Sequence, residues 1–461
     1  MSATVTYGSR TGRAVVLAAV LGSGMTFLDG TVVNVALRTI GEDLDATLAE
    51  LQWITNGYLL SLSALILLGG SLGDRFGRRR VFVIGTVVFA TASVLCGLAP
   101  TPLLLIIARV VQGVGAALLM PGSLAMIQGA FVVADRGRAI GAWSGLAGIS
   151  AAIGPFVGGW LIEYASWRWI FLINVPLAAV TVVVALRSVP ETFDPDAPTH
   201  FDISGAALVS LALGGTTYAL IEWGSIAALV AAVLAVAGAI GFLLVENRSS
   251  HPMLPLGLFR DRTFSAANAM TLVVYAALGA ITFFVVLQLQ TVGGYDALAA
   301  GIAMLPVTVC LLFLASRFGA LGTRIGPRIP MTVGPVVMAV GTLMLVPLGT
   351  DVRYVVDVLP GLTVFGLGLA VMVAPLTSTV LAAAPDDHAG IASGVSNAVA
   401  RAGSLLAVAA LPTAVGLTGE AYADPVAFDA GYQRAMVVCA VLLVLGAAVS
   451  WLLIRDPLRD A

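Results

Sequence analysis

The sequence predicts an all-α integral membrane protein with 14 transmembrane helices, arranged as two bundles of six with two helices inserted between them. Three observations predict this class: the apolar composition, a succession of long apolar runs and an internal repeat. Hydrophobic residues make up 59% of the 461 residues and charged residues 10%, whereas soluble domains carry about 45–50% and about 25%. A water-soluble core cannot enclose so much apolar surface, so the chain belongs in a lipid bilayer.

The repeat is a ten-residue pattern whose two copies lie 249 residues apart, at Gly70 (GSLGDRFGRR) and at Gly319 (GALGTRIGPR). The copies share six identical positions, and each follows one long apolar run and precedes another. A repeat of this length predicts two equivalent halves with the same basic hairpin in the same place.

A transmembrane helix needs about 20 mostly apolar residues. Dividing the chain at charged and turn-forming clusters gives fourteen runs: 14–38, 49–70, 81–99, 102–125, 138–162, 168–187, 203–222, 225–246, 266–290, 297–317, 330–348, 356–380, 389–413 and 434–454. The repeat aligns the first six runs with the last six and leaves two between them. We therefore expect an N-terminal six-helix bundle over 1–187, a linker with two inserted helices over 188–263, and a C-terminal six-helix bundle over 264–461.

The arginines predict the orientation in the membrane. With the N-terminus inside, 17 of the 23 basic residues face the inner side, four face the outer side, and Arg109 and Arg401 lie within helices. This excess fits the positive-inside rule, so we expect a multi-pass protein of the cytoplasmic membrane with both termini in the cytoplasm. The first run is too long for a cleavable signal peptide. A net charge of −2 gives no support for nucleic-acid binding.

Four segments carry a family resemblance. LDGTVVNVAL begins at Leu28, RVVQGVG at Arg109 and SAAIGPFVGG at Ser150, and they resemble the first-, fourth- and fifth-helix motifs of the fourteen-helix drug:proton antiporter branch of the major facilitator superfamily. The first copy of the repeat resembles the superfamily's signature loop, through Gly70, Gly73, Asp74, Arg75, Gly77 and Arg78. Over essentially the whole chain, the resemblance implies the major facilitator fold and transport by alternating access.

The signature loop is the first candidate site. Its glycines permit a tight turn, and its arginines hold the turn at the cytoplasmic face. Asp74 can pair with Arg78 or lie against a helix N-terminus in the other half. The resemblance implies a conformational latch between the halves, whereas the simpler alternative is that the charges only fix topology. Thr323 replaces the acid in the second copy, so we expect only Asp74 to switch.

Asp29 is the best candidate for proton coupling. An ionised aspartate inside a bilayer costs at least about 2.5 kcal/mol on insertion scales and marks a functional site by default. At about 1.5 Å per residue, Asp29 and Arg109 lie about 13 Å and about 10 Å from the outer ends of their runs, so they can pair. A static ion pair or a helix cap is the alternative. Gln112 follows Arg109 at i+3 and shares its helix face.

Other positions are candidates for the antiporter motif and the substrate cavity. Gly154, Pro155, Gly158 and Gly159 make the fifth helix pliable and allow close packing; the resemblance implies a role in limiting proton leak, and simple packing is the alternative. Asn397 and Arg401 share one face of a later helix. Glu222 and Glu246, at the ends of the inserted helices, are expected to be ordinary interfacial charges. Candidates for the substrate cavity are Asn34, Asn56, Gln112, Trp143, Tyr275, Gln288, Asn397 and Arg401.

These observations favour a proton-coupled antiporter that exports hydrophobic small molecules such as drugs or antibiotics. The alternatives are a proton symporter that imports its substrate, and an exporter of an endogenous metabolite or lipid. A membrane-embedded enzyme is disfavoured because paired acids or histidine clusters are missing from the runs. Cys96, Cys310 and Cys439 lie far apart in apolar runs and form no metal pattern. We expect no metal or cofactor, the proton gradient as the energy source, and function as a monomer.

Overall fold

The computed structural model describes residues 5–194, 201–249, 252–385, 389–417 and 424–454, and this part of the chain is almost entirely helical. The helices of the first half are α1 (Arg10–Leu44), α2 (Leu48–Phe76), α3 (Arg78–Gly97), α4 (Pro102–Ala130), α5 (Val133–Tyr164), α6 (Trp169–Leu172) and α7 (Asn174–Ser188). The inserted pair is α8 (Ile203–Ile221) and α9 (Ile226–Arg248). The rest are η1 (Leu256–Arg260), α10 (Arg262–Thr291), α11 (Ala297–Ala303), α12 (Leu305–Ile325), α13 (Arg328–Met344), η2 (Tyr354–Val358), α14 (Leu359–Ala382), α15 (Ala389–Ala414) and α16 (Pro425–Leu453).

Each of the fourteen apolar runs coincides with a helix or with two helices in line. Among the described residues, thirteen helical segments are long and apolar enough to cross a membrane. The eleventh run is α13, an apolar helix of 17 residues that falls just short of that length. Pro347 follows its end and cannot extend it, because proline lacks the N–H that the helix needs. The structure thus shows an all-helical membrane fold and leaves the count of 14 spans a prediction.

Two runs are each interrupted by a short break. Both breaks lie near the end of the bundle where α1 finishes. The sixth run is divided between α6 and α7 at Ile173, and the tenth between α11 and α12 at Met304. Prolines follow both breaks, at Pro176 and Pro306. They remove backbone donors and so favour a break at these points. We call the end of the bundle where α1 begins the near end, and the end where α1 finishes the far end.

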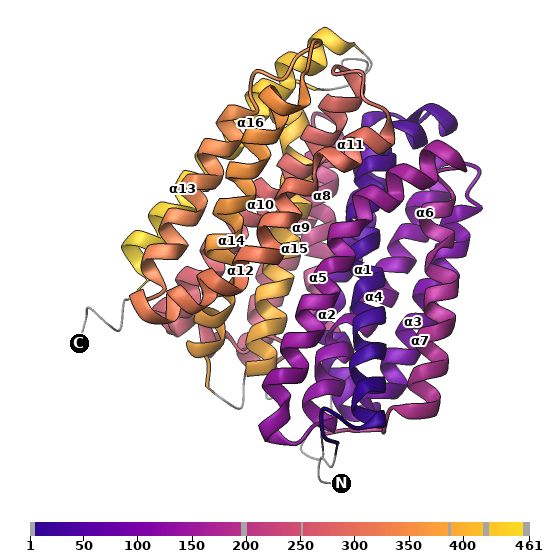
Figure 1. The fold of residues 1–461 in the computed structure, drawn as a ribbon, viewed down its shortest axis with the longest axis vertical. Helices are drawn as coiled ribbons and strands as arrows, with labels where there is room; N and C mark the ends of the chain where they lie inside the picture. The colour runs from indigo at the N-terminus through magenta and orange to yellow at the C-terminus, as the bar shows by residue number, and fades with distance from the viewer. Residues whose placement is uncertain (1–4, 195–200, 250–251, 386–388, 418–423, 455–461) are drawn as a thin grey trace.

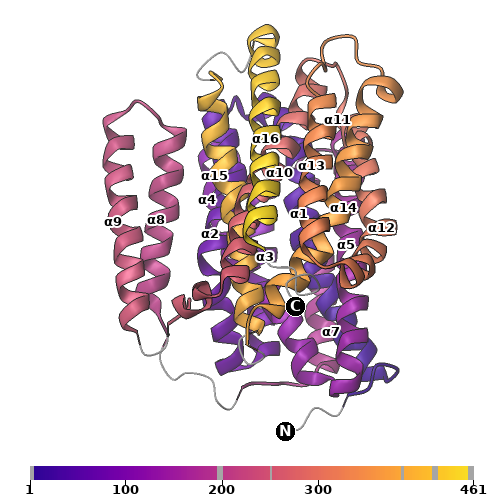
Figure 2. The same ribbon diagram turned by 90° about the vertical axis from the view of Figure 1, so that its left-hand side faces the viewer.

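The helices of the two halves lie on opposite sides of the molecule, and α8 and α9 stand apart from both as a hairpin (Figures 1 and 2). In the first half, α4 packs against α2 and α3, and α1 packs against α5. In the second half, α10 contacts α15 and α16, and α14 contacts α12 and α13. The hairpin is largely self-packed, but α8 also touches α2 of one half and α15 of the other. The halves meet through α2 and α15 and through α5 and α11.

Candidate functional site

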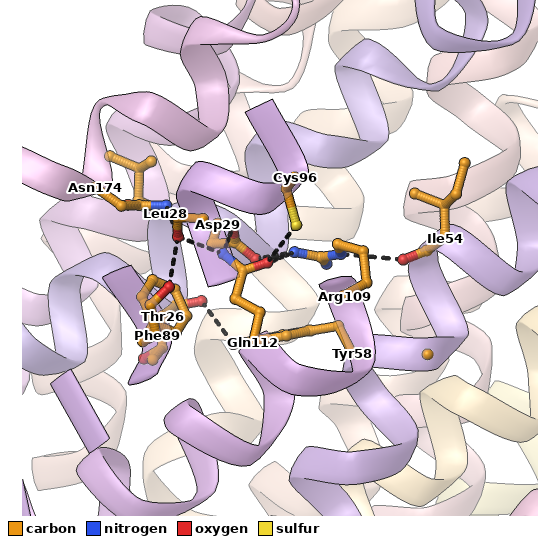
Figure 3. A network of polar contacts seen from close by, with 12 residues as sticks. Thr26, Leu28, Asp29, Ile54, Tyr58, Phe89, Cys96, Arg109, Gln112 and Asn174 are labelled. Atoms are coloured by element: carbon orange, nitrogen blue, oxygen red, sulfur yellow. Dashed lines mark hydrogen bonds and ion pairs between the residues drawn. The ribbon is translucent and has the colours of Figure 1, made fainter. Parts of the chain in front are cut away.

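The first half contains an ion pair that is sealed from solvent. Asp29 on α1 is 0% exposed and Arg109 on α4 is 1% exposed, and Arg109 Nη1 lies 2.5 Å from Asp29 Oδ2 (Figure 3). The structure thus brings together the two charges for which the sequence predicted similar depths. Burying two ions is costly, and their attraction offsets that cost only with good geometry and further hydrogen bonds.

Gln112 supplies those further hydrogen bonds and closes a ring of three side chains. Its Oε1 accepts from Arg109 Nη1 at 2.7 Å, and its Nε2 donates to Asp29 Oδ1 at 2.8 Å. The same Nε2 donates to Ser93 Oγ on α3 at 2.9 Å. Both oxygens of Asp29 are thus occupied by donors from α4. Gln112 is a member of the charge site and not of an open cavity, because it is 0% exposed.

The guanidinium of Arg109 is held on its other sides by α2. Its Nε donates to the Ile54 carbonyl at 3.0 Å, and it lies 4.4 Å from the centroid of the Tyr58 ring. Tyr58 in turn donates to the Thr26 carbonyl of α1 at 3.4 Å. The ion pair therefore joins α1, α2 and α4, so a change in its charge state acts on three helices at once.

Three members of this network were not expected from the sequence. Ser93 accepts from Gln112, Asn174 on α7 donates to Ser93 Oγ at 3.4 Å, and Cys96 Sγ lies 3.7 Å from Gln112 Oε1. Each is a small polar residue inside an apolar run. Such residues commonly bond to their own helix backbone, so only three-dimensional packing identifies them.

The signature loop makes several contacts with the chain that follows α7. Asp74 pairs with Arg78 at 2.7 Å, the first of the two partners considered for it. Glu191 accepts from the Arg79 backbone N–H at 2.9 Å, and the Asp194 N–H donates to the Asp74 carbonyl at 2.8 Å. Gly77 has φ of 108° with the Glu191 carboxyl beside it, a conformation that favours glycine.

The remaining loop residues serve the turn. Gly70 and Gly73 lie in the last turns of α2, and a Cβ at Gly73 would lie 3.9 Å from the Cα of Arg78. Arg75 is placed with its guanidinium 5.0 Å from the centroid of the Phe201 ring, just before α8. In this structure the loop is therefore docked on the linker toward the inserted hairpin, which was not expected from the sequence.

The glycines of the fifth-helix motif are sites of close helix contact. A methyl group at Gly154 would overlap Thr31, and one at Gly158 would overlap Val32, so α5 lies directly against α1 close to Asp29. Gly159 lies against the backbone of Ala297 at the start of α11. Pro155, which follows Gly154, lies against α11: a methyl group at Gly301 would overlap the Pro155 carbonyl oxygen. The motif thus fastens α5 both to the charge site and to the other half.

The expected substrate-cavity residues do not gather at one place. Gln288 is 0% exposed and donates to the Leu348 carbonyl and to Asp429 Oδ1, each at 2.6 Å, so it ties α10 to α16 at the far end. Trp143 Nε1 donates to Ser23 Oγ at 3.1 Å and ties α5 to α1. Asn34 is half-buried on α1.

Of the other candidates, only Arg401 makes a described contact with the opposite half. Arg401 on α15 lies 5.9 Å from the centroid of the Phe27 ring, two residues before Asp29. Asn397, one turn earlier, is exposed and donates to the Ser393 carbonyl of its own helix. The Tyr275 carbonyl accepts from Ser404 Oγ at 2.9 Å. Asn56 on α2 is 0% exposed, and neither atom of its amide has a described partner.

Glutamine side chains join the two halves at the far end. Gln290 of α10 donates to the Val35 carbonyl of α1 at 2.9 Å, and Arg38 donates to the Gln290 carbonyl. Gln52 of α2 donates to the carbonyls of Val408 at 2.7 Å and of Ala409 at 3.2 Å on α15. These bonds were not expected from the sequence, because a glutamine near a helix end has many ordinary roles.

Four glycines in the first half of α5 lack the close contacts that this helix makes toward the far end. At these four glycines, an added Cβ would meet no atom within 4 Å: Gly137, Gly141, Gly145 and Gly148. The far end of α5 is packed against α1 and α11, whereas the space beside these four glycines is open. Within the described chain, no group of three His, Cys, Asp or Glu residues could hold a metal ion.

Comparison with known proteins agrees with this architecture. The model of the Major Facilitator Superfamily matches residues 19–408. The tetracenomycin C resistance and export protein of Streptomyces glaucescens is 36% identical over 86% of this chain and 74% of its own length. The methylenomycin A resistance protein of Bacillus subtilis is 34% identical over 96% of this chain and 95% of its own.

Solved structures share the fold at low identity. A crystal structure of a D-xylose–proton symporter superposes with a TM-score of 0.70 at 15% identity, over 96% of this chain and 98% of that one. An inward-facing bacterial homologue of the lysosomal transporter Spinster gives 0.68 at 18% identity, over 98% and 99%. With a family match over most of its length and resistance proteins as relatives, the chain belongs to the Major Facilitator Superfamily of membrane transporters.

Proposed function

We propose that this protein is a proton-coupled antiporter that exports hydrophobic small molecules across the cytoplasmic membrane by alternating access. The observation that carries the proposal is the sealed Asp29–Arg109–Gln112 ring inside the first half. A buried carboxylate inside a membrane-spanning bundle is a functional site by default, and binding and releasing a proton is a role such residues commonly have. The names of the resistance and export relatives favour drugs or antibiotics as substrates and favour outward transport.

The coupling follows from the charges in the ring. When Asp29 is ionised, it neutralises Arg109 and the site is closed. When Asp29 takes up a proton, Arg109 keeps its charge but loses its counterion, and an uncompensated buried charge is strongly unfavourable. The guanidinium must then find water or another acceptor, which requires α4 to move against α1 and α2. Proton uptake and helix movement are thus one event.

Substrate binding and proton binding are coupled through α1. Arg401 of the second half faces Phe27, which is less than one helical turn from Asp29. A substrate that binds between α15 and α1 repositions this part of α1 and thereby disturbs the ring. In this proposal an apolar substrate favours release of the proton, and a proton favours release of the substrate. Inward movement of one proton across 100 mV supplies about 2.3 kcal/mol, enough for a substrate gradient of roughly fifty-fold.

We further propose that α13 also crosses the membrane, which gives 14 spans and places both termini in the cytoplasm. The distribution of the arginines supports this orientation. The near end is then cytoplasmic, and we propose the inward-facing state for this structure, supported by the glutamine hydrogen bonds that join the halves at the far end. In this proposal the protein works as a monomer, without a cofactor, and the proton gradient drives transport.

Inverted membrane vesicles test the proposal. We expect a proton gradient, acid inside, to drive uptake of a lipophilic dye such as ethidium into vesicles that contain the wild type, and a protonophore to abolish it. Asp29→Asn should lose gradient-driven uptake but still let dye equilibrate down its own gradient. Asp43→Asn, on the same helix but half-exposed at the far end, is the matched control and should retain driven uptake.

Three results would contradict it. Unimpaired driven uptake by Asp29→Asn would remove Asp29 from coupling. Dye export from vesicles under the same gradient would indicate symport. Accumulation of dye against its own gradient that persists without a proton gradient would exclude proton-driven antiport altogether.

A further inference from the structure

The base of the inserted hairpin contains two acidic side chains that share one buried space. Asp202 is the N-cap residue of α8, and Glu246 lies in the last turn of α9. Both are at the near end, where α8 begins and α9 ends (Figure 2). The expectation that Glu246 is an ordinary interfacial charge is wrong, because its side chain is 3% exposed; the chain after α9 folds back and covers it.

Each of the two carboxyl groups uses one oxygen for the backbone around it. Glu246 Oε2 accepts from the Leu254 N–H at 3.1 Å. Asp202 Oδ1 accepts from the Gly205 N–H at 2.7 Å and from Ser204 Oγ at 3.0 Å. The other two oxygens, Glu246 Oε1 and Asp202 Oδ2, are buried and receive no hydrogen bond from the described residues.

The two unbonded oxygens both lie beside Gly205. A Cβ at Gly205 would lie 2.9 Å from Glu246 Oε1 and would overlap Asp202 Oδ2. Since both oxygens approach this one point, the two carboxyl groups are close neighbours. Two ionised carboxylates cannot hydrogen-bond to each other, since each is only an acceptor, and as close neighbours they repel each other. One proton removes the repulsion and supplies the missing donor.

We propose that Asp202 and Glu246 bind one proton between them, so that the hairpin base is a proton-binding site separate from Asp29. The surrounding elements supply little opposing charge. The face of α2 toward this base is apolar, with Leu65, Leu67 and Leu68 packed against its small core.

The basic groups nearby are oriented elsewhere. Arg75 lies over Phe201, and Arg248 on α9 is exposed. Asp74 on α2 pairs with Arg78. His200 and His251, which are near this base in the sequence, lie outside the described residues. Both are therefore replaced in one variant of the experiment.

The bound proton joins two parts of the linker, one of which leads into the second half. Through Glu246, the start of α8 is joined to Leu254, which leads into α10 of the second half. At its far end, α8 contacts both sides of the seam: the Tyr218 ring lies 6.2 Å from that of Trp53 on α2, and the Leu220 carbonyl accepts from Thr413 of α15. Loss of the proton therefore loosens an element that bridges the two moving bundles, and it does so in response to the pH at the near end.

Infrared difference spectroscopy of the purified protein in lipid nanodiscs, titrated between pH 5 and pH 9, tests the site without any substrate. We expect a carboxylic-acid C=O band that disappears as the pH rises. Glu246→Gln and Asp202→Asn should each remove this band, since both are isosteric and leave a single carboxyl group hydrogen-bonded to an amide. Asp29→Asn should leave the band in place, and so should Glu222→Gln at the opposite end of the hairpin and the double change of His200 and His251 to Gln.

Thermal unfolding across the same pH range is the second readout. The folded pair keeps a proton that the unfolded chain releases above about pH 4. Stability should therefore fall as the pH rises, until the folded pair has also ionised. In Glu246→Gln, the glutamine amide donates to Asp202 at every pH. This variant should therefore lose the pH-dependent change in stability.

The proposal is overturned if both isosteric variants keep the infrared band and the pH-dependent step. It is also overturned if the histidine double variant loses them. Stabilisation of the wild type by calcium or magnesium at pH 9, absent in Glu246→Gln, would identify a cation site in place of a proton site. Because Asp29→Asn is measured in parallel, failure here is distinguishable from failure of the antiport proposal.

Discussion

Removing one partner of the buried ion pair gives a stability effect whose size and pH dependence follow from the structure. Arg109→Met leaves Asp29 fully buried with Gln112 as its described donor. Breaking a buried pair in this way costs about 3–5 kcal/mol. Asp29 can limit the loss by taking up a proton, at about 1.4 kcal/mol for each pH unit. The destabilisation should therefore be smaller at pH 5 than at pH 8.

Asp29→Asn leaves the opposite charge behind. Arg109 keeps the Ile54 carbonyl, Gln112 Oε1 and the face of Tyr58, but it loses its counterion and cannot give up its own charge. We expect a similar loss of about 3–5 kcal/mol that does not change between pH 5 and pH 8. The double variant buries no charge and should be more stable than the sum of the single losses predicts, by at least about 2 kcal/mol.

Chemical unfolding in mixed micelles, followed by tryptophan fluorescence, measures the three variants against the wild type at both pH values. The Arg38→Met and Glu42→Gln pair provides the matched cycle, because those side chains form an exposed i, i+4 bridge. Exposed bridges contribute about 0–1 kcal/mol, so that cycle should show little coupling. Additive losses at Asp29 and Arg109, or an equal effect of pH on all variants, would refute the reasoning.

Three further changes test the rest of the network. Gln112→Leu removes both hydrogen bonds that close the ring and should cost about 2–3 kcal/mol in the same unfolding assay, while Gln112→Glu should be worse at pH 8 than at pH 5. Gln52→Leu together with Gln290→Leu removes three side-chain hydrogen bonds between the halves at the far end. We expect the population of the state that is open at the far end to rise by roughly tenfold or more. Distances between spin labels on the two halves measure this, and an unchanged distance distribution would contradict it. Gly158→Leu overfills the contact with α1 and should cost about 1–3 kcal/mol, whereas the same change at Gly145, where the space is open, should cost less.

The sequence predicted the helical membrane fold and the pairing of Asp29 with Arg109 because both depend on local regularities. Apolar runs identify helices, and a constant rise per residue fixes depth along a helix. Depth does not fix the direction in which a side chain points or the neighbour it meets. For that reason Gln288, which has a plausible depth for a cavity, instead bonds to Asp429 and a backbone carbonyl.

The parts that could not be predicted all depend on packing between distant segments. Ser93 and Asn174 resemble any small polar residue in an apolar run until α3, α4 and α7 are assembled. The docking of Glu191 on the signature loop joins residues more than a hundred positions apart. Glu246 stands at the end of an apolar run, where charges usually meet water, and only the fold of the following chain buries it.

Proton release on substrate binding tests the central claim most directly, namely that Asp29 is the carboxyl that exchanges its proton for substrate. Purified protein in a weakly buffered solution with a pH-sensitive dye is mixed with a substrate found in the vesicle assay. The account predicts that the wild type releases protons in proportion to the substrate bound, and that Asp29→Asn binds substrate but releases none. Equal proton release by the two proteins, or substrate binding by the wild type without any release, would contradict it.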